Sequence, residues 1–187
     1  KHELYTPDNI VVVMAGHVDH KSAAELVGKY FSMEESKRKY DFDALLNKDG
    51  GDVNLTEKKT EQAHVAVGFP SYPEGHKDHW GVKLLSVILG GNMSSRMFLG
   101  VREAKGLAYY IHTSTDNYMD GGVIVTNAGV DLQRIDEAIT GVINEYRIVR
   151  DEDIPAAELK KAKAYLKGKM ILNLEDCEEF AHLLAKY

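Results

Sequence analysis

The sequence predicts an α+β fold, a two-layer α/β arrangement in which a mainly antiparallel, mixed sheet packs against helices. Apolar and polar residues alternate over 62–69, as in a strand with one buried face. Two further strand-like runs, 108–115 and 122–128, flank a short polar turn, which is typical of an antiparallel pair. Apolar residues at helical spacing over 132–146 indicate a helix of the second layer.

Length and composition describe an ordinary globular chain. Its 187 residues suffice for one domain, or for one domain and a piece of another. The net charge of −6 argues against a nucleic-acid partner, which needs a basic face. That charge would suit a basic peptide, although solubility alone explains it. No apolar run approaches the roughly 18 residues of a membrane span.

Cysteine usage bears on the compartment. Cys177 is the single cysteine, so no intramolecular disulfide can form. This fits a reducing compartment, and we expect a cytoplasmic location. Acidic neighbours on both sides of Cys177 argue against a thiolate nucleophile.

The first 61 residues divide into two parts. A continuous apolar run over 10–14, closed by Ala15 and Gly16, predicts a buried strand. Ser22 and Glu25 have the spacing of a capping box for a helix that ends near Phe31. Residues 1–32 therefore read as one strand-helix unit. Residues 33–61 are charged, contain Asp-Gly-Gly-Asp and read as a linker.

Residues 62–187 form the main α/β domain of the prediction. After the first strand, a loop over 71–79 leads into a helix over 80–89 that is apolar nearly all round and therefore buried. Asp131 can cap a helix that runs to about Val149, and Pro155 suits the first turn of another. A last helical piece starts near Glu175 and is still periodic where the sequence ends, which suggests truncation.

The segment 89–110 reads L-G-G-N-M-S-S-R-M-F-L-G-V-R-E-A-K-G-L-A-Y-Y. Its glycine pair can end one helix, and Ser94 or Ser95 can cap a second helix that Gly106 ends. A strand rich in aromatic and aliphatic residues follows. Arg102 then lies in the last turn of the second helix and Tyr109 in the strand. A guanidinium and a phenol hydroxyl in this arrangement can be aimed at the same point.

This segment closely resembles the zinc metallopeptidases of the pitrilysin/insulinase type, which include mitochondrial processing peptidase and its bacterial relatives. More than a dozen positions of L-G-G-x-M-S-S-R-x-F-x-x-x-R-E-x-K-G-L-A-Y agree in order without a gap. The better match is to the half of such proteins that holds no zinc. The resemblance implies that residues 1–32 close a preceding repeat, that 33–61 join the repeats, and that 62–187 form the second repeat.

The zinc motif of that family is missing from this sequence. An inverted H-x-x-E-H motif places two histidines and a glutamate on a helix. His17 and His20, like His76 and His79, are three residues apart, but no glutamate lies between them. We expect both pairs to be solvated loop residues. The sequence therefore predicts no catalytic residue and no metal ligand in this chain, with zinc present in the full-length enzyme.

Arg102 and Tyr109 are the candidate substrate-binding residues. An arginine in the last turn of a helix is favoured by the helix dipole, and a tyrosine suits a half-buried strand, so a purely structural role is open. The resemblance implies instead that both donate hydrogen bonds to the substrate's backbone carbonyl near the scissile bond, where charge develops. Tyr110 should face the opposite side of the strand by alternation.

The leading functional hypothesis is the substrate-binding, non-zinc portion of a zinc metalloendopeptidase, inactive alone. Its partners would be a peptide or unfolded polypeptide and the zinc-bearing N-terminal repeat, in cis or in trans. One alternative is a catalytically inactive partner or core subunit that acts as a scaffold, and another is a free peptide-binding module. Residues 9–31 are further predicted to fill a vacant sheet position in the second repeat, within one chain or by exchange in a homodimer.

Overall fold

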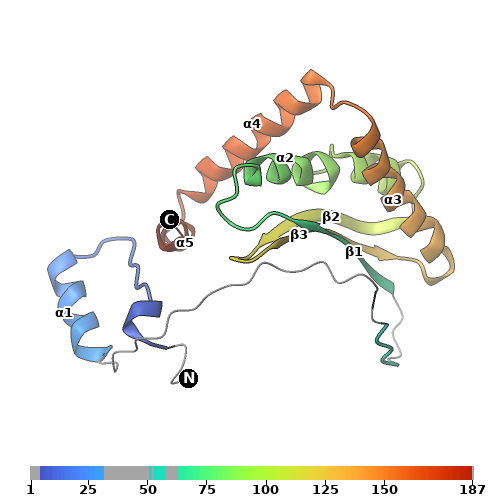
Figure 1. Cartoon of the computed structure of the whole chain (residues 1–187). Helices are drawn as coiled ribbons and strands as arrows, with labels where there is room; N and C mark the ends of the chain where they lie inside the picture. The colour runs from blue at the N-terminus through green and yellow to red at the C-terminus, as the bar shows by residue number, and fades with distance from the viewer. Residues whose placement is uncertain (1–4, 32–50, 52, 58–62, 187) are drawn as a thin grey trace. The chain divides into compact units, whose positions relative to one another are not determined.

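The computed structural model describes residues 5–31, 51, 53–57 and 63–186 (Figure 1). The elements follow in the order η1 (Pro7–Asn9), α1 (His20–Tyr30), β1 (Ala63–Ser71), α2 (His79–Gly90), η2 (Phe98–Glu103), β2 (Ala108–Asn117), β3 (Gly122–Val130), η3 (Leu132–Arg134), α3 (Ile135–Asp151), α4 (Ala156–Asn173) and α5 (Cys177–Lys186). Two compact units result: a sheet unit, residues 42–166, and a terminal unit, residues 1–41 with 167–187. None of the helices in the described ranges is both long and apolar enough to cross a membrane.

The sheet unit contains an antiparallel sheet with the strand order β1-β3-β2. β3 lies in the centre and pairs with β1 from Ala63↔Val130 to Ser71↔Gly122. It pairs with β2 on its other side, where the register shifts between Ala108 and Tyr110. The predicted α+β fold is confirmed, and the sheet is antiparallel throughout.

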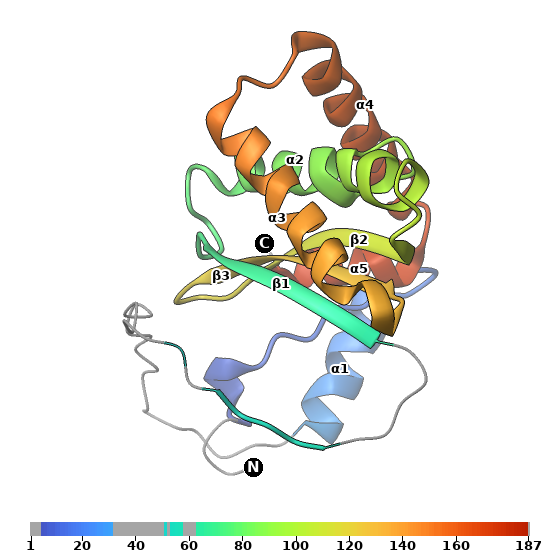
Figure 2. The same cartoon turned by 90° about the vertical axis from the view of Figure 1, so that its right-hand side faces the viewer.

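Helices cover one face of this sheet, as Figures 1 and 2 show. α2 packs on β2 and β3, and α3 packs on β1 and β3. The core between them is formed by side chains from the strands, the helices and the segment 97–107: Leu89, Met97, Val101, Leu107, Val130 and Val142 are almost fully buried. Burial of these apolar side chains is the main favourable term that holds the two layers together.

Close approach between α2 and β2 depends on Gly90. A Cβ atom at this position would lie 2.6 Å from the backbone nitrogen of Thr113, so any side chain would force the helix and strand apart. Thr113 and Thr126 share a hydrogen bond of 2.8 Å within the buried layer, and Thr126 shares another with the Tyr146 hydroxyl. These hydroxyls satisfy one another where water is excluded.

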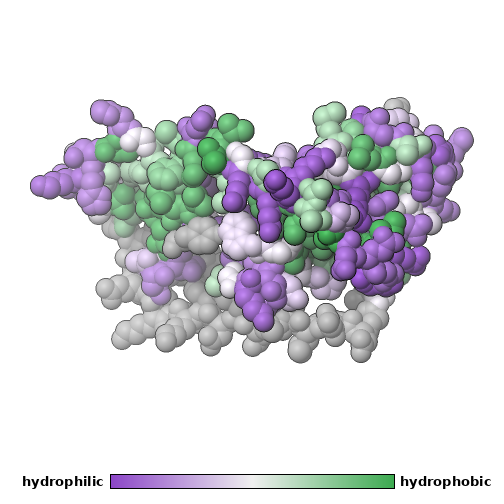
Figure 3. Space-filling view, turned by 90° about the horizontal axis from the view of Figure 1, so that it is seen from above, coloured by the Kyte–Doolittle hydropathy of each residue, from purple (hydrophilic) through white to green (hydrophobic). Residues whose placement is uncertain are grey.

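The terminal unit exposes much apolar surface. Val11 is 73% exposed and Met14 48%, and Phe180 and Leu184 of α5 are also exposed. Figure 3 shows hydrophobic residues gathered over this unit, toward the left of the view. Between the run 12–18 and α1 lies an open groove with a volume of about 550 Å³. Cys177, at the start of α5, is a free and exposed thiol.

Two predictions for residues 1–32 are wrong. The run 10–14 forms no strand, because the sheet built from the described residues offers it no partner and an unpaired segment makes no ladder. That residues 9–31 fill a sheet position of the second repeat, within one chain or by exchange between two, stays a prediction. α1 is capped by Asp19, whose carboxylate accepts from the amide and the hydroxyl of Ser22, so Ser22 is not the cap.

The other predicted helices and strands of 62–187 are present, with boundaries shifted by a few residues. Asp131 caps η3, its carboxylate accepting from the amide of Gln133, and α3 continues from there. The predicted linker over 33–61 lies mostly outside the described residues. Only 51 and 53–57 are described there, and they belong to no helix or strand.

Candidate functional site

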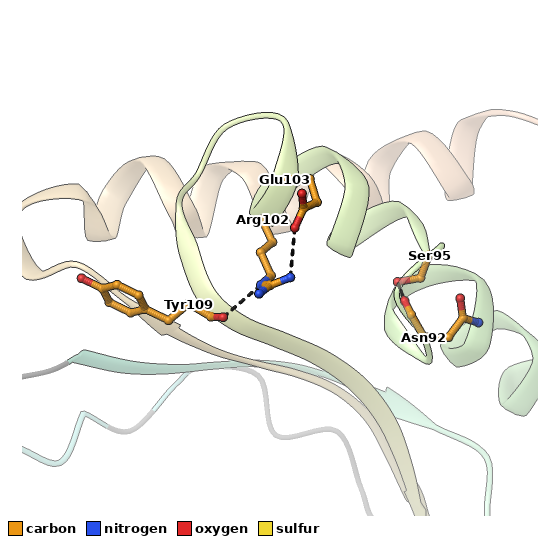
Figure 4. A network of polar contacts seen from close by, with 5 residues as sticks. All are labelled: Asn92, Ser95, Arg102, Glu103 and Tyr109. Carbon is orange, nitrogen blue, oxygen red and sulfur yellow. Dashed lines mark hydrogen bonds and ion pairs between the residues drawn. The ribbon is translucent and has the colours of Figure 1, made fainter.

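The segment between α2 and β2 begins with a turn centred on Asn92. The Asn92 side-chain oxygen accepts hydrogen bonds from the amide and the hydroxyl of Ser94, at 2.9 and 2.7 Å. Its backbone carbonyl accepts from the hydroxyl of Ser95 at 2.6 Å (Figure 4). The residue that organises this turn is therefore Asn92, not Ser94 or Ser95 as predicted. A short amide side chain can reach the backbone two residues ahead, which favours such turns.

The second helix of this segment contains a π-helix, η2, over Phe98–Glu103. The amide of Ala104 donates to the carbonyl of Leu99, five residues back, at 2.9 Å. Gly106 then leaves the helix at φ +57°, in the left-handed region that favours glycine. The predicted helix and its glycine stop are confirmed. The wider π turn was not predicted, and such turns are frequent at functional sites.

Arg102 projects from η2 and is held on three sides. Its Nε donates to the backbone carbonyl of Tyr109 at 2.9 Å, and its Nη1 donates to the carboxylate of Glu103 at 3.0 Å (Figure 4). The ring of Phe98 lies against the guanidinium, with its centroid 4.5 Å from Cζ. The side chain of Arg102 is still 34% exposed. Within the part of the chain that the structure describes, Nη2 makes no hydrogen bond.

Tyr109 is the extra residue of a β-bulge, since Ala108 pairs with Val130 and Tyr110 with Gly129. Its side chain is 64% exposed. Figure 4 shows its phenol pointing away from the Arg102 guanidinium, so the two side chains do not converge on one point as the spacing suggested. They are connected through the backbone carbonyl of Tyr109. Their role in binding substrate stays a prediction.

Tyr110 lies on the face of the sheet away from the helices. Its hydroxyl is 3.0 Å from Nδ1 of His64, across the central strand. The bulge interrupts the alternation on which the placement of Tyr110 relative to Tyr109 depended. Both tyrosines are exposed. Sequence alternation alone could not decide which tyrosine belongs to the site, because the extra residue of a β-bulge is not recognisable in the sequence.

An ion pair with α4 fixes the start of this segment. Arg96 Nε and Nη2 donate to the two carboxylate oxygens of Glu158 at 2.9 and 2.6 Å. The hydrogen bond from Arg96 lowers the pKa of Glu158. Glu145 of α3 approaches the same region, because a Cβ on Gly100 would lie 2.8 Å from its Oε1. Burial raises the pKa of Glu145, while Arg96 acts in the opposite direction. Helix α3 thus packs against η2, and α4 holds Arg96 in the turn that precedes it.

The structure places the two histidine pairs of the sequence in different surroundings. His17 and His20 are exposed as predicted, but His20 begins α1 and does not lie in a loop. His79 begins α2 and is only 5% exposed, so the prediction of a solvated loop residue is wrong for His79. His76 stacks on Tyr72, and its Nδ1 accepts from the amide of Asp78. No group of three histidine, cysteine, aspartate or glutamate side chains within 5–31 and 63–186 is placed to hold a metal ion.

The sequence is similar to those of known proteins over most of its length. Residues 1–166 match the family model of the peptidase M16 inactive domain. The chain is 33% identical over 175 residues to the uncharacterized zinc protease YmxG of Bacillus subtilis, which covers 93% of this chain and 42% of that protein. It is 31% identical over 189 residues to an uncharacterized zinc protease of Streptomyces coelicolor, with 97% and 41% covered. The chain thus spans about two fifths of the length of these relatives.

Solved structures share the fold. A protease from Helicobacter pylori superposes with a TM-score of 0.72 at 26% identity, over 92% of this chain and 43% of that one. A peptidase M16 inactive domain from Pseudomonas fluorescens superposes with a TM-score of 0.64 at 19% identity, over 80% and 37%.

Proposed function

We propose, on the premise that the chain belongs to the peptidase M16 inactive-domain family, that it is the substrate-binding, non-zinc portion of a zinc metalloendopeptidase. Its substrate is a peptide or an unfolded polypeptide. The zinc ion and its ligands belong to an N-terminal repeat, on the same polypeptide or on a separate chain. Support comes from the absence of an H-x-x-E-H motif in this sequence and from the names of its relatives, which are zinc proteases.

The exposed guanidinium of Arg102 is the observation that carries this proposal. The carbonyl of Tyr109 and the carboxylate of Glu103 hold the side chain in one position. A donor fixed before the substrate arrives loses little freedom on binding and stabilises charge that develops on an acceptor oxygen. The free side of the fork therefore suits a peptide carbonyl, and a charged donor makes that hydrogen bond strong.

Tyr109 supplies a second donor at a different point along the bound peptide. β-Bulges re-aim side chains beside binding sites, and this one leaves the Tyr109 phenol exposed. Because the phenol points away from Arg102, the two donors contact separate groups of an extended peptide. This differs from the shared oxygen that the sequence resemblance implies.

The terminal unit is the surface that meets the zinc-bearing repeat. Its run 10–14 is apolar and unpaired, and the groove beside α1 is lined by apolar residues such as Val12, Met14 and Val27. Exposed apolar patches of this kind mark interaction sites. A partner that supplies a neighbouring strand would satisfy the backbone of this run and cover its side chains.

The test is a kinetic comparison in the enzyme assembled from this chain and its zinc-bearing half. Arg102→Ala should lower kcat/KM about 10- to 1,000-fold, the range found for loss of one oxyanion donor. Arg150→Ala is the matched control, because Arg150 is exposed and its side chain pairs with the neighbouring Asp151. Unchanged kinetics for Arg102→Ala would favour the scaffold role instead.

A further inference from the structure

The carboxylate of Glu103 accepts from Nη1 of Arg102, next to the Nη2 group that is left for a ligand. Nη1 of Arg102 and Oε1 of Glu103 are 3.0 Å apart, and the Glu103 side chain is 56% exposed. On a regular helix, consecutive side chains point in different directions and do not face each other. Here the two side chains are in contact on the π-helix η2, while Nε of Arg102 donates to the carbonyl of Tyr109.

Some N–H groups of Arg102 bind the protein, and the others are left for a ligand. A guanidinium has five N–H groups, of which one on Nε and one on Nη1 are already used. Phe98 covers one face of the plane, so a ligand approaches the edge that carries Nη2. That edge offers hydrogen bonds in a fixed direction.

The charge at this edge is close to neutral, because one carboxylate accompanies one guanidinium. A neutral oxygen, such as a peptide carbonyl, accepts from Nη2 without approaching the Glu103 carboxylate as a like charge. A carboxylate ligand is attracted by Arg102 and repelled by Glu103, so the repulsion offsets part of the attraction. Like charges placed side by side are a common means of rejecting a wrong partner.

We infer that Glu103 sets the selectivity of the Arg102 site for neutral acceptors and against acidic substrate residues. This inference rests on the proposed function, because it requires that Arg102 contacts the substrate. The substrate class is then narrowed to polypeptides with a neutral or basic residue at the position next to Arg102. Glu103 acts on specificity and takes no part in bond breaking.

The test compares cleavage of a mixed peptide library by the assembled enzyme and by its Glu103→Gln variant. Glutamine keeps the size of the side chain and an oxygen acceptor for Nη1 but removes the charge. The variant should cleave peptides with Asp or Glu at one or two positions beside the bond about 3- to 10-fold more often, relative to Asn or Gln. The gain should shrink at high salt, which screens exposed charges.

Asp151→Asn is the control variant. Asp151 pairs with the preceding residue, Arg150, on α3 and is also 56% exposed, so its neutralisation removes an equivalent charge elsewhere. It should leave the library profile unchanged. Equal acid frequencies for Glu103→Gln and the parent, with cleavage still lowered by Arg102→Ala, would overturn the inference and leave the proposed function standing. Normal cleavage by Arg102→Ala would overturn the proposed function itself.

Discussion

The guanidinium of Arg102 donates to the backbone carbonyl of Tyr109, while the phenol of Tyr109 points away from it (Figure 4). The link between these residues is therefore a backbone contact that survives most substitutions of the Tyr109 side chain. The Arg102 guanidinium and the Tyr109 hydroxyl face different directions, so removing each donor should have a separate effect on substrate binding.

Arg102→Ala and Tyr109→Phe should each lower kcat/KM of the assembled enzyme, by about 10- to 1,000-fold. Their effects should be additive in free energy, because the phenol and the guanidinium contact separate groups of the substrate. A double-mutant cycle in kcat/KM measures this. A double variant no worse than either single variant would show that the hydroxyl and the guanidinium act on one oxygen.

Gly90→Ala should destabilise the sheet unit by about 1–3 kcal/mol, because the added methyl group would overlap the backbone of Thr113. Gly81→Ala in the same helix is the matched control. Apart from the nearby backbone of α2 and the two neighbouring residues, no atom lies within 4 Å of its ideal Cβ, so alanine should stabilise α2 by about 0.5–1 kcal/mol. Urea denaturation of the chain measures both changes. Equal stabilities for the two variants would contradict the close packing of α2 on β2.

The ion pair between Arg96 and Glu158 should stabilise the fold only above acidic pH. Because the pKa of Glu158 is lowered in the folded state, its contribution is fully present above the ordinary value of 4.5 and is lost as the pH falls through the lowered pKa. The difference in unfolding free energy between the parent and Glu158→Gln should therefore shrink below pH 4.5. A difference independent of pH would exclude the pairing.

Glu145 should change the stability of the fold with pH in the opposite direction to Glu158. Burial raises its pKa in the folded state, so its ionised form weakens the fold as the pH rises above 4.5. Glu145→Gln should be more stable than the parent at neutral pH, and this advantage should disappear in acid. The same series of urea titrations, run from about pH 3 to 7, separates the two glutamates by the sign of their slopes.

The hydrogen-bonded hydroxyls of Thr113, Thr126 and Tyr146 should contribute to stability unequally, and substitution of the central residue, Thr126, should cost most. Thr126 bonds to both Thr113 and Tyr146, so Thr126→Val removes one partner from the buried hydroxyl of Thr113 and from the partly buried hydroxyl of Tyr146, at a cost of about 1–3 kcal/mol. Tyr146→Phe removes one end and should cost about 0.5–1.5 kcal/mol. Tyr118→Phe, at an exposed turn position, should cost less than either. Thermal unfolding ranks the three, and the reverse order would refute the network.

Most of the sheet unit could be predicted, because its signals are local. Alternation in β1 and the helical spacing in α3 follow directly from which faces meet the core. Gly106 indicated the end of the second helix, because the chain leaves that helix with a positive φ, which glycine adopts readily. These features depend on residues close to one another in the sequence, so the sequence alone is enough to predict them.

The details of the site could not be predicted for the opposite reason. The π turn of η2 packs against α3, and the bulge at Tyr109 lies in the pairing of β2 with β3; neither leaves a sequence pattern. The choice of Asn92 and Asp19 as turn and cap residues was decided by competition between adjacent polar side chains. The run 10–14 reads as a strand, but strand formation requires a partner strand that the described residues do not supply.

The most direct test of the central claim is an assay of peptide hydrolysis by this chain alone and with the zinc-bearing half added. The account predicts no hydrolysis by the chain alone, even with added zinc, and hydrolysis that a chelator abolishes once both halves are present. Chelator-sensitive hydrolysis by the 187-residue chain alone would contradict it, because that result would place the catalytic centre within this sequence.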